Sequence, residues 1–168
     1  EGDNRIAKSP RSYYATLRKN GSTDNRTPLV NLHSCFGWII GCDGSQICEG
    51  WISNTDLDFF LVGYITDGVT MNTNAPDLSL GTITEWLDLT ALPSSSVMGF
   101  IEVSSSGTYS YGLRKNGSAE DIYYYAKRHP MGFVECDGDY KIEGKIENVG
   151  VDFFLVGVAA KAAALNYP

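Results

Sequence analysis

The chain has 168 residues, of which 43% are hydrophobic and 20% charged, and its formal net charge is −7. This composition is typical of a soluble globular protein, and no apolar run approaches the roughly 20 residues that a membrane helix needs. The acidic balance argues against a nucleic-acid-binding protein, which would need a basic face, and against docking on anionic lipid.

The same blocks of sequence occur twice. LRKNGS stands at residues 17–22 and again at 113–118, an offset of 96. At an offset of 94 follow CDG (42–44 and 136–138), EG (49–50 and 143–144) and DFFLVG (58–63 and 152–157). Exact blocks at matched spacing indicate a duplicated module. We therefore divide the chain into a first module (residues 1–66), a second module (residues 67–158) and a C-terminal tail (residues 159–168).

Three signals are typical of strands and turns in the first module. Asn20-Gly21 predicts a type I′ turn, because this dipeptide accepts positive φ at both central positions. Residues 38–42 and 46–48 flank Asp43-Gly44 and predict a β-hairpin. Residues 59–62 are apolar on both faces and predict a central strand covered from both sides.

The second module repeats these signals at Asn116-Gly117, around Asp137-Gly138 and at residues 153–156. Residues 82–89 predict its first strand, residues 97–103 an apolar strand, and residues 108–113 a strand with period-two alternation. Many short strands with such turns predict an all-β protein of two tandem antiparallel β-sandwich (jelly-roll-like) modules.

The two modules differ at their starts. Residue 2 aligns with Met98, so we expect the first module to lack its opening strand and to carry an open edge or groove. The tail is expected to extend into a neighbouring subunit as an added strand, and a short helix or a frayed end are the alternatives. Such a contact is head-to-tail, and it closes into a ring or continues as a filament. The candidate assembly residues are Ala160, Ala163, Leu165 and Tyr167.

The repeat divides the four cysteines into two groups. Cys42 and Cys136 are equivalent, whereas Cys35 and Cys48 occur only in the first module. Two cysteines that are present together predict a Cys35–Cys48 disulfide and an oxidising compartment, with two buried free thiols as the alternative. The chain has no CxxC spacing and only two histidines, so the sequence predicts no metal site.

No catalytic, phosphate-binding or cofactor-attachment motif occurs, so we expect no enzyme and no cofactor. Repeated polar residues beside aromatic ones are candidates for ligand contact. The alternative is that an Arg–Asp pair locks two strands and that the aromatic residues fill a core. The ligand-contact candidates are Arg18, Trp51, Asp58, Arg114, Tyr124 and Asp152.

Asn-x-Ser/Thr sequons mark Asn20, Asn25 and Asn116 as glycosylation candidates, and Asn-Gly in a tight turn is the alternative explanation for Asn20 and Asn116.

The strings GLRKNGS, CDG and DFFLVGY resemble tandem modules of uncharacterised predicted extracellular proteins of prokaryotes and their phages, over nearly the whole chain. This resemblance implies an extracellular, cell-surface or virion-surface location. We expect a non-enzymatic structural subunit of a filament or fibre, with copies of itself as partners and with no nucleic acid or membrane span. The alternative is a carbohydrate- or receptor-binding module of an adhesin or phage fibre, with glycans as partners.

Overall fold

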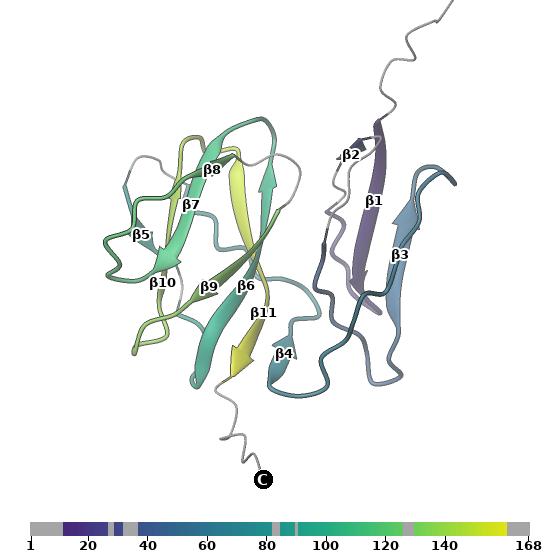
Figure 1. Cartoon of the computed structure of the whole chain (residues 1–168), viewed down its shortest axis with the longest axis horizontal. Coiled ribbons are helices and arrows are strands. Elements are labelled where there is room, and N and C mark those ends of the chain that lie inside the picture. Colours follow the sequence, from purple (N-terminus) through teal and green to yellow (C-terminus); the bar gives the residue numbers. More distant parts are fainter. Residues whose placement is uncertain are drawn as a thin grey trace, which may run out of the picture.

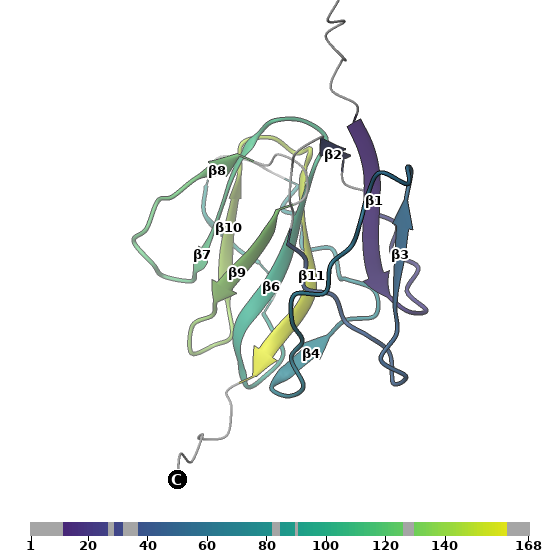
Figure 2. The same ribbon diagram turned by 45° about the vertical axis from the view of Figure 1, so that its right-hand side comes forward.

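The computed structural model of the chain describes residues 12–26, 29–31, 37–81, 85–89, 91–125 and 130–160. Within these ranges every regular element is a strand, which confirms the all-β prediction (Figures 1 and 2). All the strand pairs in the described residues are antiparallel. The strands are β1 (Ser12–Lys19), β2 (Leu29–Asn31), β3 (Cys48–Ile52), β4 (Val69–Met71), β5 (Leu87–Asp88), β6 (Ser96–Ser105), β7 (Ser110–Lys115), β8 (Tyr124–Tyr125), β9 (Met131–Glu135), β10 (Ile142–Ile146) and β11 (Val151–Ala160).

The second module forms two four-stranded sheets that enclose one core. One sheet has the order β5-β10-β7-β8 and the other the order β4-β11-β6-β9. β10 alternates buried and half-buried residues, as expected of a strand with one face on a core. The most deeply buried core side chains are Ile101, Val103, Ile142, Ile146, Val151 and Phe153.

Most strands predicted for the second module are confirmed. Residues 97–103 lie in β6, and residues 153–156 lie in β11, which is an inner strand between β4 and β6. The alternating segment at residues 108–113 is largely β7. The predicted first strand at residues 82–89 is reduced to β5, and residues 82–84 lie outside the described residues.

The hairpin predicted around Asp137-Gly138 is wrong. β9 pairs with β6 and β10 pairs with β7, so this turn connects the two sheets instead of two neighbouring strands. The physical reason is that β5 and β7 already occupy both edges of β10. In the first module the hairpin is also wrong, because residues 38–42 form no strand.

The Asn-Gly turns are present, but the predicted type I′ geometry is wrong. Only the glycines have positive φ, 78° at Gly21 and 74° at Gly117. One positive φ at the third position is the pattern of a type II turn. The asparagine side chains instead donate hydrogen bonds to Asp43 and Asp137.

The first module forms a three-stranded sheet of order β2-β1-β3. Its pairing repeats that of β8-β7-β10, since Arg18 faces Glu49 as Arg114 faces Glu143. The central strand predicted at residues 59–62 is wrong, because these residues form no strand. Residues 1–11, which the repeat aligns with residues 97–107, lie outside the described residues, so the expected lack of an opening strand before them stays a prediction.

The two copies of the apolar segment give a matched test of this fold. Phe153→Ala removes a fully buried ring, so we expect the free energy of unfolding to fall by about 3–5 kcal/mol. Phe59→Ala changes a ring that is 40% exposed, so its cost should be smaller, about 1–2 kcal/mol. Urea denaturation of dilute protein measures both values, and equal costs would contradict the exposure of residues 58–63.

Candidate functional site

The repeated arginine and glutamate residues form an ion pair across neighbouring strands in each module. Arg18 Nε lies 2.6 Å from Glu49 Oε2, and Arg114 Nε lies 2.5 Å from Glu143 Oε2. Each guanidinium also donates a hydrogen bond to a backbone carbonyl six residues on, Asp24 in the first module. The hydrogen bond from Arg18 lowers the pKa of Glu49.

The repeated Asn-Gly and Asp-Gly turns are joined side chain to side chain. Asn20 Nδ2 donates to Asp43 Oδ2 at 2.5 Å, and Asn116 Nδ2 donates to Asp137 Oδ2 at 2.7 Å. The other carboxylate oxygen of Asp137 accepts the backbone N–H groups of Asp139 and Lys141. The strings LRKNGS, CDG and EG therefore encode a structural clamp that is built the same way twice.

The ligand-contact candidates are not gathered into one site. Arg18 and Arg114 are engaged by glutamates, so the predicted pairing with aspartate is replaced by pairing with Glu49 and Glu143. Asp152 accepts a hydrogen bond from the hydroxyl of Ser79 at 3.2 Å, and Asp58 is exposed.

The aromatic candidates lie in different surroundings. Tyr124 is half-exposed and packs at 5.8 Å on the ring of Tyr111. Burial raises the pKa of Tyr111 to about 12. Trp51 is half-exposed on β3, where it lies opposite Thr16 of β1, and Tyr14, two residues earlier on β1, is half-exposed as well.

Sequence reasoning missed a cluster around Trp86 in the second module. The Arg114 guanidinium lies 4.1 Å from the centre of the Trp86 ring, and the indole N–H donates to Asp121 at 2.8 Å. Tyr123 donates to the same Asp121 oxygen and accepts a bond from Lys145. Hydrogen bonds from Tyr123 and Trp86 lower the pKa of Asp121. Neither Trp86 nor Asp121 lies in a repeated string, so the repeat gave no signal for this cluster. The polar groups of the cluster form hydrogen bonds with one another.

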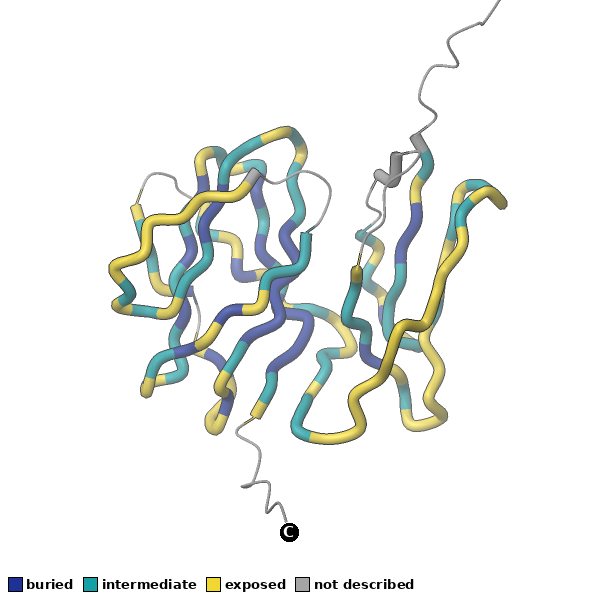
Figure 3. The backbone as a smooth tube through the Cα atoms, viewed as in Figure 1, coloured by how far each residue is buried: buried dark blue, intermediate teal, exposed yellow. Residues whose placement is uncertain are grey.

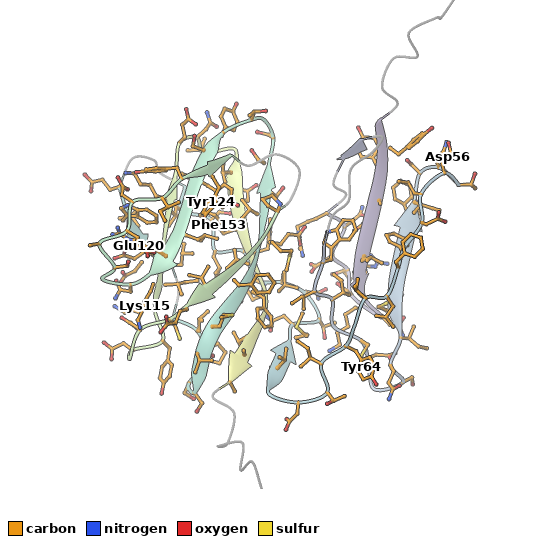
Figure 4. The ribbon with its side chains drawn as sticks, viewed as in Figure 1. Asp56, Tyr64, Lys115, Glu120, Tyr124 and Phe153 are labelled. Carbon is orange, nitrogen blue, oxygen red and sulfur yellow. The ribbon has the colours of Figure 1, made fainter. Side chains whose placement is uncertain are left out.

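The string DFFLVG occupies two opposite environments. In β11, Leu155 is 5% and Val156 8% exposed, whereas their counterparts Leu61 and Val62 are 86% and 99% exposed. We call residues 58–66 the unpaired segment, because they form no ladder with the described residues. Figure 3 shows it as a continuous exposed stretch between β3 and β4, whereas β11 is largely buried. Phe153 lies inside the second module and Tyr64 on the outside of the first (Figure 4).

The first phenylalanine of the unpaired segment nevertheless packs on the same repeated glycine as its counterpart in β11. A side chain at Gly50 would lie 3.0 Å from the ring of Phe59, and one at Gly144 would lie 3.0 Å from the ring of Phe153. The edge of Trp38 also packs on Phe59, with ring centres 6.3 Å apart. Phe59 therefore holds the segment against β3 as Phe153 holds β11 against β10, but the described residues provide no strand beside it.

In the second module, residues 69–78 cover the edge of β11 opposite β6. β4 pairs with residues 157–159, and Asp77 forms a bridge with Phe154. The backbone N–H of Leu78 donates to Phe153 at 2.8 Å, and that of Leu155 donates to Pro76 at 3.0 Å. A segment that directly follows the first module thus completes the sheet of the second.

An ion pair fixes the junction between the modules. Arg26 Nε lies 2.9 Å from Glu102 Oε2, and its Nη1 lies 3.1 Å from Asp24 Oδ2. The guanidinium carbon lies 4.4 Å from the centre of the Phe154 ring. Glu102 is buried, so its charge depends on these partners.

The remaining candidates stay predictions. Cys48 has a free and exposed thiol, and its proposed partner Cys35 lies outside the described residues. Among the glycosylation candidates, Asn25 is exposed, whereas Asn20 and Asn116 use their amides in the clamp. Ala160 is the last residue of β11, where it faces Ser96, and Ala163, Leu165 and Tyr167 lie outside the described residues.

Comparison of the chain with protein-family models, with curated proteins and with solved structures finds no match. In the part of the chain that the structure describes, no helix is long and apolar enough to cross a membrane. Among the same residues, no three His, Cys, Asp or Glu side chains are grouped to hold a metal ion.

The clamp makes stability depend on pH in a defined direction. Hydrogen bonds from Lys141 and Asn116 lower the pKa of Asp137 from 3.8. A depressed carboxyl pKa stabilises the folded state above the unfolded pKa and loses this effect as the pH falls through the folded pKa. Wild-type protein should therefore lose stability below about pH 4, and Asp137→Asn should flatten that loss. The fall in the urea unfolding midpoint between pH 5 and pH 3 measures this loss of stability, and Asp139→Asn, at an exposed neighbour, serves as the control. An equal fall in wild type and in both variants would contradict the role of Asp137.

Proposed function

We propose that the chain is a structural subunit that assembles head to tail with copies of itself into an extracellular filament or fibre. The observation that carries the proposal is the unpaired segment, whose sequence is buried and paired as β11 in the second module. Exposed strand edges and contiguous apolar patches are typical of interaction sites. The location outside the cytoplasm follows from the resemblance of the repeated strings to predicted extracellular modules.

The energetics favour assembly through backbone pairing. Burying one large apolar side chain contributes about 1.5–3 kcal/mol, so Phe60, Leu61 and Val62 together contribute roughly 5–9 kcal/mol. Bringing two chains together costs an estimated 4–15 kcal/mol. The side chains alone offset this cost at best, so a stable contact also needs hydrogen bonds along the edge of the segment.

Assembly is tested by the mass of the full chain in solution. We expect species heavier than one chain, growing with concentration in sedimentation velocity and visible by electron microscopy. Phe60→Asp should abolish them, because it places a charge in the apolar contact, while the folded monomer is unaffected at an exposed position. Val149→Asp alters an exposed apolar residue on the turn before β11 and serves as the matched control. A wild type that stays monomeric at all concentrations overturns the proposal.

The alternative function, a carbohydrate-binding module, is favoured by Trp51 and Tyr14. Both are half-exposed aromatic side chains on adjacent strands of the first module. Aromatic rings with one exposed face suit contacts to partly apolar ligands. We expect a glycan array to detect binding that Trp51→Ala reduces at least tenfold, with Phe133→Ala, at a half-exposed aromatic residue of β9, as a control in the second module. Absence of binding to every glycan contradicts this alternative.

A further inference from the structure

The junction between the two modules already contains a donated strand. β4 lies directly after the unpaired segment and pairs with β11 of the second module (Figure 2). Asn72, the next residue, donates its backbone N–H to Val156 at 2.9 Å and its side-chain Nδ2 to Leu155 at 2.8 Å. One module thus delivers the edge strand that completes the next.

The repeat aligns a segment of the tail with β4. At the offset of 94, β4 corresponds to residues 163–165, with Leu165 in the place of Met71. Asn166 stands where Asn72 stands, so the residue with the double hydrogen bond is present in the tail as well. The tail therefore keeps the asparagine and a long apolar residue before it, with alanines in the places of Val69 and Thr70.

The glycine of DFFLVG identifies where this strand binds. A side chain at Gly157 would lie 2.6 Å from Met71 Sδ and 2.7 Å from Thr70 O, so β4 requires glycine there. Gly63 is the equivalent residue, yet a side chain there would meet nothing within 4 Å. The first module keeps the residue that close approach demands, with open space where a strand would lie.

A second contact between the modules also has a counterpart in the repeat. Arg26 packs on Phe154 between the modules, and the repeat counterparts of these residues are Ile122 and Phe60. Ile122 is 51% exposed, and Phe60 is more exposed still. The polar contact within the chain thus corresponds to an apolar pair whose two members both lie exposed.

From these observations we propose that residues 163–166 of a second copy bind as an antiparallel strand along the unpaired segment, as β4 binds to β11. This inference rests on the proposed function of head-to-tail assembly. The register of β4 on β11 sets Leu165 opposite Gly63, Ala164 opposite Tyr64 and Ala163 opposite Ile65. Ile122 of the donor then packs on Phe60 of the acceptor. Because donor and acceptor surfaces differ, each added chain offers a free tail to the next.

The test separates donating from accepting. A chain that ends at Ala160 keeps β11 intact and has no donor strand. Gly63→Val leaves the free chain unstrained, because the space is open and the φ of Gly63 is not positive, but its side chain collides with a docked strand. Each variant alone should be monomeric in sedimentation velocity, and a 1:1 mixture should form a dimer and nothing larger. Gly37→Val, at another glycine with open space, should assemble as wild type does.

Other outcomes are equally decisive. If wild type assembles and the shortened chain assembles as well, the tail is not the donor, and the proposed function stands without this inference. If the shortened chain fails but Gly63→Val assembles, the tail binds elsewhere and the inference is overturned. A monomeric wild type overturns both. Leu165→Asp in the full chain, with its fold checked by circular dichroism, repeats the donor test without truncation and should lower assembly at least tenfold.

Discussion

An apolar strand inside a sheet must have its peptide groups paired along both edges, because a buried unpaired group costs about 1–3 kcal/mol. β11 meets this requirement with β6 on one edge and residues 69–78 on the other. In this strand Phe153 lies fully inside the core. The same letters in the first module have no such neighbours among the described residues, and their side chains lie in solvent. The environment of the edges, more than the hexapeptide itself, decides whether these residues form a strand.

The repeated sequence predicted many of the strands, but it did not predict that DFFLVG is buried in one module and exposed in the other. Turn residues and alternation located β6, β7 and β11, because these signals are local. The sheet to which a strand belongs is not local. β9 and β10 flank a tight Asp-Gly turn, yet they pair with β6 and β7, because the edges of β10 are occupied by strands distant in sequence. The exposure of Phe60 escaped prediction for the same reason, since nothing within DFFLVG says which partners are present.

The candidate site was predictable to a similar degree. Repetition marked Arg18 and Arg114, but their cross-strand partner is glutamate, because Glu49 and Glu143 lie directly opposite in the register. Repetition also hid what is unique, since Trp86 and the Arg26–Glu102 pair each occur once. A buried ion pair adds little stability, although removing one partner is costly, so its clearest effect is to specify one arrangement. Arg26 and Glu102 therefore set the first module against the second in a way that the apolar pair Ile122 and Phe60 does not imitate.

An exposed apolar segment is also a risk, since identical segments can stack on one another without limit. The charges around this segment oppose that outcome. Parallel stacking would place Asp58 on Asp58 and Asp67 on Asp67, and like charges directly opposite are destabilising. A tail in the register of β4 would instead bring Lys161 opposite Asp67, an attractive pair. The segment is thus better matched in charge to the tail than to itself, which opposes the stacking of identical edges.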